Sequence, residues 1–162
     1  MRRAEREVKD PKALREILDA CKVCRVALTD EQGIYIVPLN FGYEFQDGRW
    51  TLYFHSAKEG RKMRAIATSP QVAFEMDGAH RLIRADQACG HSYEYQSIVG
   101  SGRARILEDL EEKKKALTLL MEHQTGMEFS ITDQMAQGVS VFCIEVQSIA
   151  GKRNKPLGSL DD

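Results

Sequence analysis

Residues 50–64 read Trp-Thr-Leu-Tyr-Phe-His-Ser-Ala-Lys-Glu-Gly-Arg-Lys-Met-Arg, an alternating pattern that runs directly into a basic one. Apolar and more polar side chains alternate at first, with Trp50, Leu52 and Phe54 on one face and Thr51, Tyr53 and His55 on the other. Successive side chains of a strand point to opposite faces of the sheet. The alternation therefore predicts a half-buried strand over 50–55.

A helix is predicted to begin directly after this strand. Ser56 stands three residues before Glu59, which is the spacing of a capping box, in which each side chain accepts a backbone N–H of the first turn. The first turns are rich in cations, namely Lys58, Arg61, Lys62 and Arg64. These charges gather at the end where the helix dipole is already positive.

Such a junction can bind an anion. A phosphate monoester would be held by free backbone N–H groups, the Ser56 hydroxyl and the forked donors of Arg61. The alternative is a basic helix face that is simply solvated, and charge alone does not decide between the two.

Length and charge limit the classes of function. A chain of 162 residues with 43% hydrophobic residues can bury one core, so we expect a single domain over 1–162 with loosely structured ends at 1–8 and 152–162. The formal net charge of −1 argues against general binding to nucleic acid or to an anionic membrane.

The sequence shows neither a membrane-spanning segment nor a signal peptide, and both bear on where the protein is located in the cell. No apolar run approaches the roughly 20 residues that a membrane-spanning helix needs, and the first residues lack the apolar core of a signal peptide. We therefore expect a cytoplasmic protein.

The cysteines do not indicate a metal or redox site. Cys21 and Cys24 form a C-x-x-C pair, but the pair closes a predicted helix and opens a strand, the reverse of a redox dithiol. Cys89 and Cys143 lie far apart, and the nearest histidine, His91, has no partner at ligand spacing. We expect buried or half-buried thiols and no structural metal.

The remaining pattern predicts a β-dominated (α+β) fold of six to seven mainly antiparallel strands with about three flanking helices. Strand-like runs lie at 23–29, 34–43, 50–55, 71–76, 93–107 and 139–149. Besides the basic helix after Ser56, helices are predicted from caps at Asp10 and Asp109, while 79–90 has no clear period. Gly100 and Gly102 interrupt the longest strand, as expected where a strand bends around a barrel.

Several motifs follow one another along the chain: Arg2-Arg3-x-x-Arg6-Glu7, Val37-Pro38-Leu39-Asn40-Phe41-Gly42-Tyr43, Tyr53-Phe54-His55-Ser56-Ala57-x-Glu59-Gly60-Arg61-Lys62, Tyr95-x-Ser97-x-x-Gly100-x-Gly102-Arg103-Ala104 and Ile149-x-Gly151-Lys152-Arg153. In this order they resemble the FMN-binding split β-barrels related to pyridoxamine 5′-phosphate oxidase. Within that family they are most similar to the Nim-type (5-nitroimidazole resistance) branch.

The resemblance implies a homodimer with two FMN molecules between the subunits, each touching both chains. Ser56, Arg61 and Lys62 would hold the FMN phosphate, while the backbone of Val37, Pro38, Leu39 and Asn40 would lie along the isoalloxazine ring. Gln96 and Ser97, and more weakly Arg103, match the part of the barrel that reaches the partner's flavin. The alternative for each of these last three is an ordinary strand residue.

His55 would lie beside the flavin, where a histidine could orient a substrate or act as a proton donor. The alternative is a hydrogen-bonded structural histidine. The oxidase itself carries a C-terminal substrate motif with tryptophan, arginine and histidine, whereas the only tryptophan here is Trp50. Oxidation of vitamin B6 is therefore not expected.

The resemblance thus implies an FMN-dependent oxidoreductase that reduces electron-poor small molecules such as nitroaromatics or 5-nitroimidazoles. A second reading is a non-catalytic protein of the same fold that binds or senses flavin, or binds haem through His55, His80, His91 or His123. A third is a dimeric packing module with a vestigial site.

Overall fold

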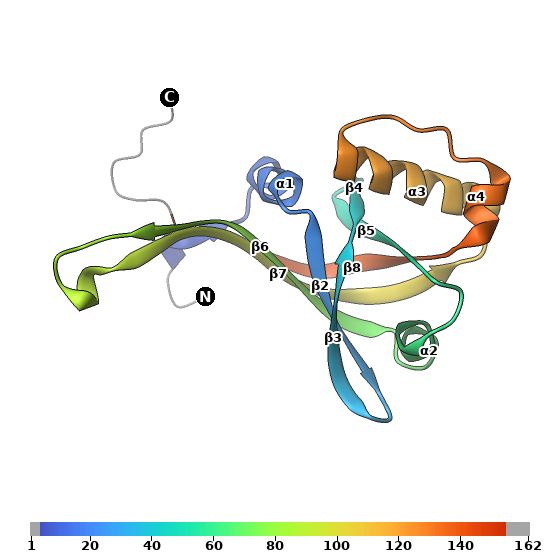
Figure 1. Ribbon diagram of the computed structural model, residues 1–162, viewed down its shortest axis with the longest axis horizontal. Coiled ribbons are helices and arrows are strands. Elements are labelled where there is room, and N and C mark those ends of the chain that lie inside the picture. Colours follow the sequence, from blue (N-terminus) through green and yellow to red (C-terminus); the bar gives the residue numbers. More distant parts are fainter. Residues whose placement is uncertain (1–3, 155–162) are drawn as a thin grey trace.

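A computed structural model describes residues 4–154 of the chain, and its centre is one eight-stranded antiparallel sheet (Figure 1). The strands run in the order β3-β2-β6-β7-β8-β5-β4, and the short β1 pairs with β8 beside this path. Their bounds are β1 Glu7–Val8, β2 Val23–Asp30, β3 Gly33–Asn40, β4 Gly42–Gln46, β5 Arg49–Ser56, β6 Gln71–Ile83, β7 Ser92–Leu107 and β8 Ser140–Asn154.

Helices flank this sheet on different sides. The α-helices are α1 Pro11–Ala20, α2 Arg61–Thr68, α3 Leu110–Thr125 and α4 Asp133–Gly138, with 3-10 turns η1 Ala4–Arg6 and η2 Ala88–Gly90. α3 packs over β4 and β5, whereas α2 packs against β2 and β7. Within residues 4–154, no helix is both long enough and apolar enough to cross a membrane.

The predicted strand 34–43 is in fact two strands. β3 ends at Asn40, Phe41 is fully buried, and β4 begins at Gly42 and pairs with β5 instead of β2. A side chain at Gly42 would collide with the backbone of Leu120 in α3, so glycine allows the close approach of β4 to this helix. The sequence predicted six to seven strands and about three helices. This break and the short β1 account for the additional strands, and α4 is the additional helix.

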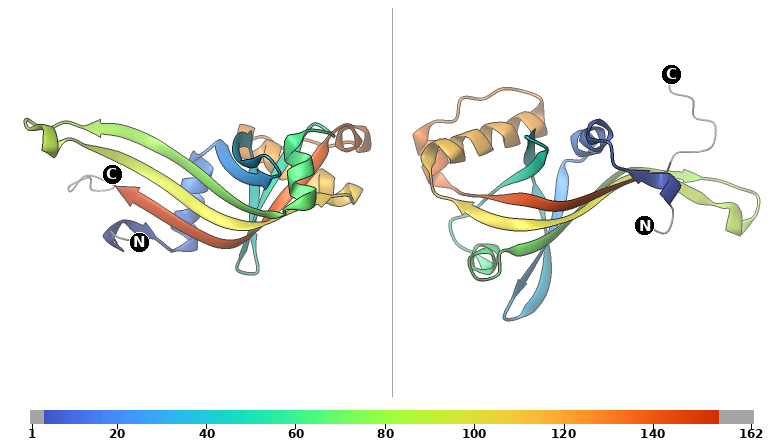
Figure 2. Two further views of the ribbon diagram at one scale, coloured as in Figure 1. Left: turned by 90° about the horizontal axis from the view of Figure 1, so that it is seen from below. Right: turned by 180° about the vertical axis from the view of Figure 1, so that it is seen from behind.

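The β6–β7 hairpin extends beyond the rest of the sheet as a curved arm (Figures 1 and 2). The region 79–90, which had no clear sequence period, contains the end of β6 and the turn η2 at the tip of this arm. Nearer the core, the ladder between β7 and β8 shifts register between Ser101 and Gly102, which confirms the predicted irregularity at the glycines.

The hydrophobic core has two parts. The larger part includes the fully buried Phe54 and Phe142, whose rings stack at 4.9 Å between centroids. The smaller part lies under α3 and contains Tyr53, Leu117 and Cys143. Both faces of β5 are therefore covered over most of its length.

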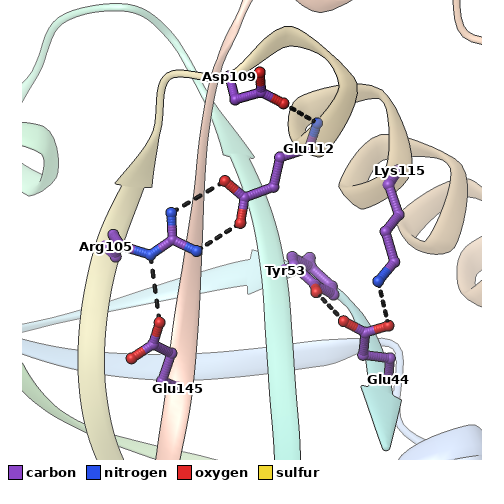
Figure 3. Close-up of polar contacts among 7 residues, drawn as sticks. All are labelled: Glu44, Tyr53, Arg105, Asp109, Glu112, Lys115 and Glu145. Atoms are coloured by element: carbon purple, nitrogen blue, oxygen red, sulfur yellow. Dashed lines mark hydrogen bonds and ion pairs between the residues drawn. The ribbon is translucent and has the colours of Figure 1, made fainter. Parts of the chain in front are cut away.

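Polar contacts attach α3 to the sheet (Figure 3). Asp109 caps the helix by accepting the Glu112 N–H at 2.9 Å, which confirms the predicted cap. The Glu112 carboxylate forms a two-point ion pair with Arg105 of β7, with 3.1 Å from Nη1 to Oε2. This pair takes the place of the contact from Glu112 to the Asp109 N–H that would complete a capping box. Further along the helix, Lys115 pairs with Glu44, which also accepts the Tyr53 hydroxyl.

Part of each segment that was expected to be loose belongs to the sheet. Glu7 and Val8 pair with Lys152 and Gly151, and β8 continues to Asn154, where the sequence analysis expected loose ends at 1–8 and 152–162. Ladder hydrogen bonds hold both segments, which corrects that expectation for these residues. The motif residues Arg2 and Arg3 lie outside the described part of the chain.

Candidate functional site

The junction between β5 and α2 differs from the sequence prediction in where the helix begins. The strand is confirmed, since Trp50, Leu52 and Phe54 are buried, but α2 begins at Arg61. Ser56 is instead the last residue of β5 and pairs with Ser140 of β8. The predicted capping box of Ser56 is therefore wrong, because the ladder holds that residue in extended conformation.

Gly60 is the N-cap of α2, with φ of 146° and no side-chain cap. This is a backbone conformation that residues with a Cβ rarely adopt, so glycine fits the sharp entry into the helix. The first backbone N–H groups of any α-helix have no acceptor within the helix. At α2 these groups belong to Arg61, Lys62 and Met63.

The Ser56 hydroxyl is a buried polar group without a partner. Its residue is only 5% exposed, on the same face of β5 as Leu52 and Phe54, and Oγ makes no hydrogen bond to any described residue. Leaving such a group unsatisfied typically costs about 1–3 kcal/mol. An unpaired hydroxyl of this kind, a few residues before a free helix N-terminus, fits a bound oxygen-rich ligand.

Arg61 is held in place by two residues that the sequence analysis did not select. Its Nε and Nη2 donate to the two carboxylate oxygens of Asp30 at 2.6 and 2.9 Å. Its Cζ lies 4.2 Å from the centre of the Tyr35 ring, so the guanidinium is in cation–π contact with that ring. The hydrogen bond from Arg61 holds the pKa of Asp30 below its usual value.

The basic cluster predicted around α2 is consequently less positive than its sequence suggests. A surface cavity beside α2 is lined by Asp30, Glu31, Gln32, Arg61, Arg64, Ala65 and Thr68. The β2–β3 turn thus brings two carboxylates next to the arginines. Only the hairpin itself was predictable, because contact between its turn and α2 is a tertiary feature.

The four predicted ring-contacting residues lie on β3, an edge strand whose ladder partner is β2. Val37 and Leu39 are half-buried toward the core, whereas Pro38 and Asn40 are exposed on the other face. An edge strand accommodates proline because one row of its backbone N–H groups is not needed for a ladder. The Asn40 amide also donates to Lys22 O and Gln124 Oε1, at 3.1 and 3.0 Å.

The structure brings β3 and α2 together. Tyr35, which stacks on Arg61, lies on the same face of β3 as Val37 and Leu39. The strand from Tyr35 to Asn40 spans about 17 Å at about 3.4 Å per residue. A ligand that reaches from α2 along β3 would therefore be elongated, with its anionic end at Arg61.

His55 is exposed and points to the face of β5 opposite Ser56, because the two residues are adjacent in the strand. Its ring makes no hydrogen bond to any of residues 4–154. Lys62 is half-buried in the first turn of α2.

Gln96 and Ser97 are not near Arg61 in the same chain. They lie on β7, where Ser97 pairs with Asp77 of β6. Arg103, opposite Gln71 just after α2, is six residues away from Ser97, or about 20 Å along the strand. Within one chain, the predicted site residues therefore form two separate groups.

One outer face of the sheet carries members of both groups, namely Pro38 and Asn40 of β3 and Ser97 of β7. Pro38, Arg25, Glu75 and Val99 form a row across β3, β2, β6 and β7. Arg25 joins Glu75 and Asp77 on this face, at 2.9 and 2.7 Å. Large exposed apolar side chains surround the ion pairs: Ile34 at 76%, Ile36 at 64%, Val99 at 55% and Val23 at 40% exposure. Clustered exposed apolar side chains are typical of an interaction surface.

Cys21, Cys24 and His123 are buried or half-buried in the fold. Cys21 and Cys24 are buried free thiols, as predicted, and burial raises the pKa of Cys21 to about 11. His123 lies between Phe41 and Tyr43 with Nε2 2.9 Å from Cys21 O, and burial lowers its pKa. Residues 4–154 contain no cluster of three or more potential metal ligands.

Comparison with known families gives one clear match. A family model described as pyridoxamine 5′-phosphate oxidase matches residues 10–153. Comparison with curated proteins gives no match.

Among solved structures, a candidate 5-nitroimidazole antibiotic resistance protein from Bacteroides thetaiotaomicron is 33% identical. It aligns over 91% of this chain and 86% of its own, with a TM-score of 0.78. The flavocytochrome Anf3 from Azotobacter vinelandii is 18% identical over 100% of this chain and 75% of its own, also with a TM-score of 0.78. An FAD- and haem-binding protein from Mycobacterium smegmatis is 18% identical over 97% and 76%, with the same TM-score.

The last two similarities concern the fold alone. Together with the antiparallel sheet, they confirm the predicted split-barrel fold class.

Proposed function

This chain belongs to the pyridoxamine 5′-phosphate oxidase family, and from that membership we propose that it is an FMN-dependent oxidoreductase. Its substrates are electron-poor small molecules such as nitroaromatics and 5-nitroimidazoles. The substrate class is supported by the nitroimidazole resistance protein, which is 33% identical to this chain where the two align.

The observation that carries the proposal is the unpaired, buried Ser56 hydroxyl before the N-terminus of α2. The flavin phosphate would accept hydrogen bonds from Ser56, from the first backbone N–H groups of α2 and from Arg61 and Lys62. These donors suit a dianion because the helix dipole and two cations act at the same end. The residues present therefore fit the phosphate of FMN.

The isoalloxazine ring would lie along Val37, Pro38, Leu39 and Asn40, where β3 has a free backbone edge. When bound, FMN supplies the electron transfer itself, and the protein supplies position and environment. His55, exposed at the end of β5, would orient the substrate or donate a proton.

We further propose a homodimer that completes this site. Gln96 and Ser97 of one chain are separated from Arg61 of the same chain, so they would reach the flavin of a second copy. The outer face with Ile34, Ile36 and Val99 supports this arrangement, because it exposes apolar side chains between β3 and β7.

Oxidation of pyridoxamine phosphate is not part of the proposal. Trp50, the only tryptophan, is 5% exposed and packs against Phe45 with 4.4 Å between ring centroids. It is part of the core and cannot grip a substrate.

The test is an absorption spectrum of the purified protein, followed by titration of the flavin-free protein with FMN. We expect a yellow protein that binds FMN. Once a nicotinamide or a chemical reductant has reduced the bound flavin, a nitroaromatic compound should reoxidise it. The Ser56→Ala variant should bind FMN about tenfold or more weakly, since a hydrogen bond to a charged group is lost. Its thermal stability should not fall, because the variant removes a buried unpaired hydroxyl.

Four results would contradict the proposal. Wild-type protein that gains no flavin from added FMN would exclude the cofactor, and Ser56→Ala protein with unchanged affinity would exclude the phosphate site. Bound flavin that reduces no nitro compound would favour a flavin-binding protein without catalysis. A Soret band in place of a flavin spectrum would favour haem.

A further inference from the structure

The Arg61 side chain is fixed by contacts on one edge and one face. Asp30 takes one edge of the guanidinium through Nε and Nη2, and Tyr35 covers one face at 4.2 Å. Arginine side chains otherwise carry a large conformational freedom, about 2 kcal/mol of rotamer entropy. These two contacts restrict that freedom before any ligand arrives.

Asp30 is itself held by the β2–β3 turn. Its Oδ1 accepts the backbone N–H of Gln32 at 2.9 Å, and Gly33 has φ of 103°, which favours glycine. The carboxylate is therefore oriented by the hairpin and presented to α2. The side chain of Asp30 is 18% exposed and that of Arg61 is 38% exposed.

The pair leaves part of the guanidinium available. A guanidinium has five N–H donors, and Asp30 uses one on Nε and one on Nη2. Both donors of Nη1 and the second donor of Nη2 remain, and together they form the end of the fork. This end matches two oxygens of a phosphate.

We propose that Asp30 and Tyr35 are positioning residues that hold Arg61 in the orientation in which it binds the flavin phosphate. This inference rests on the proposed function, since it assigns two further residues to the same site. Asp30 also repels a phosphate, but the Arg61 charge lies between the two anions, and solvent screens the remainder at this partly exposed site. The positioning of Arg61 by Asp30 therefore affects phosphate binding more than the repulsion between Asp30 and the phosphate does.

The test compares FMN with riboflavin, which has the same ring system and no phosphate. Asp30→Asn keeps the size of the side chain and the acceptor for Gln32, but loses the two-point charged pair with Arg61. We expect FMN affinity to fall about 3- to 10-fold, the equivalent of ordering one long side chain, and riboflavin affinity to stay unchanged.

Tyr35 is tested by a pair of variants. Tyr35→Leu removes the ring under Arg61 and should weaken FMN binding, again without an effect on riboflavin. Tyr35→Phe keeps the ring, removes only the hydroxyl and should retain wild-type affinity for FMN.

A matched control is the Arg105–Glu112 pair, which has the same two-point geometry on the α3 side of the sheet (Figure 3). Glu112→Gln should leave the affinity for both flavins unchanged. In an Arg61→Ala background, Asp30→Asn should no longer lower FMN affinity, because the group that Asp30 positions is absent. Circular dichroism of each variant checks that it is folded.

The outcomes separate this inference from the proposed function. Wild-type protein that binds no FMN overturns both. Wild-type protein that binds FMN, with Asp30→Asn protein of equal or higher affinity, overturns the positioning role alone. An equal loss of riboflavin affinity would also overturn it, since the effect would then not act through the phosphate.

Discussion

Ser56 and His55 are consecutive residues, yet their side chains have opposite surroundings. Ser56 is buried with its hydroxyl unpaired, whereas His55 is exposed on the other face of β5. The alternation of a strand thus separates a group suited to anchoring a phosphate from one suited to contact with a diffusing substrate. This division of roles leads to different expectations for the two residues.

His55→Gln should lower turnover without weakening FMN binding. Glutamine keeps a polar side chain of similar length but cannot transfer a proton, and a positioned proton donor typically contributes about 100-fold or more to a rate. The measurement is kcat for nitroaromatic reduction, together with FMN affinity by titration.

The control for this variant is His91→Gln, another exposed histidine, which follows η2 at the tip of the β6–β7 arm and whose Nδ1 lies 3.2 Å from Gln87 O. It should leave kcat unchanged. A His55→Gln protein with wild-type turnover would remove the catalytic role of His55, and one that lost FMN binding would make it a cofactor ligand instead.

At the scale of elements, local patterns in the sequence predicted most of the fold. The caps at Asp10 and Asp109 lie where the sequence indicated them, and Gly126, with φ of 70°, ends α3. The start of α2 was mispredicted because Ser56 can serve either as a helix cap or as a ladder residue. The choice depends on Ser140, far away in sequence.

The same limit applied to the site. The strands at 23–29 and 34–43, on either side of the turn at Asp30, and the basic helix at Arg61 were each predicted, but nothing local indicates that the turn and the helix meet. Arg61 and Asp30 come into contact only in the folded chain, where α2 packs against β2.

Gly102→Ala should destabilise the sheet at the β7 bulge. A Cβ at this position would meet the backbone carbonyl of Glu145 and lie 2.9 Å from Ile144 Cγ2. Overpacking of this kind costs about 1–3 kcal/mol. Each kcal/mol lowers Tm by about 2–4 °C in a chain of this size, which thermal unfolding can measure.

Gly138→Ala in α4 is the matched control for this prediction. A Cβ there has no neighbour within 4 Å, so Tm should stay the same or rise slightly. Equal Tm for Gly102→Ala and wild type would mean that β7 and β8 can separate at the bulge without cost.

At the scale of the whole molecule, part of the proposed site lies on the outer face of β3, β2, β6 and β7. Pro38 and Asn40 at one side and Ser97 at the other all lie on this face. Three strand spacings separate β3 from β7, or about 14 Å. Two copies that pack these faces together, related by a twofold axis, can bring Ser97 of each toward β3 of the other.

Ile36→Lys should therefore separate the dimer and weaken FMN binding together. Ile36 is 64% exposed and lies beside Ala27 of β2, so in the free chain a lysine there is solvated and the fold is retained. In the dimer the same lysine would be buried among apolar side chains without a partner, which is strongly unfavourable. Light scattering after size-exclusion chromatography measures the mass, and titration measures FMN affinity.

Met135→Lys provides the control, since Met135 in α4 is 58% exposed but does not belong to the outer face. It should stay dimeric and bind FMN normally. A dimeric Ile36→Lys protein would locate the interface elsewhere. A monomeric variant with full FMN affinity would mean that one chain holds the flavin alone, and Gln96 and Ser97 would then be ordinary strand residues.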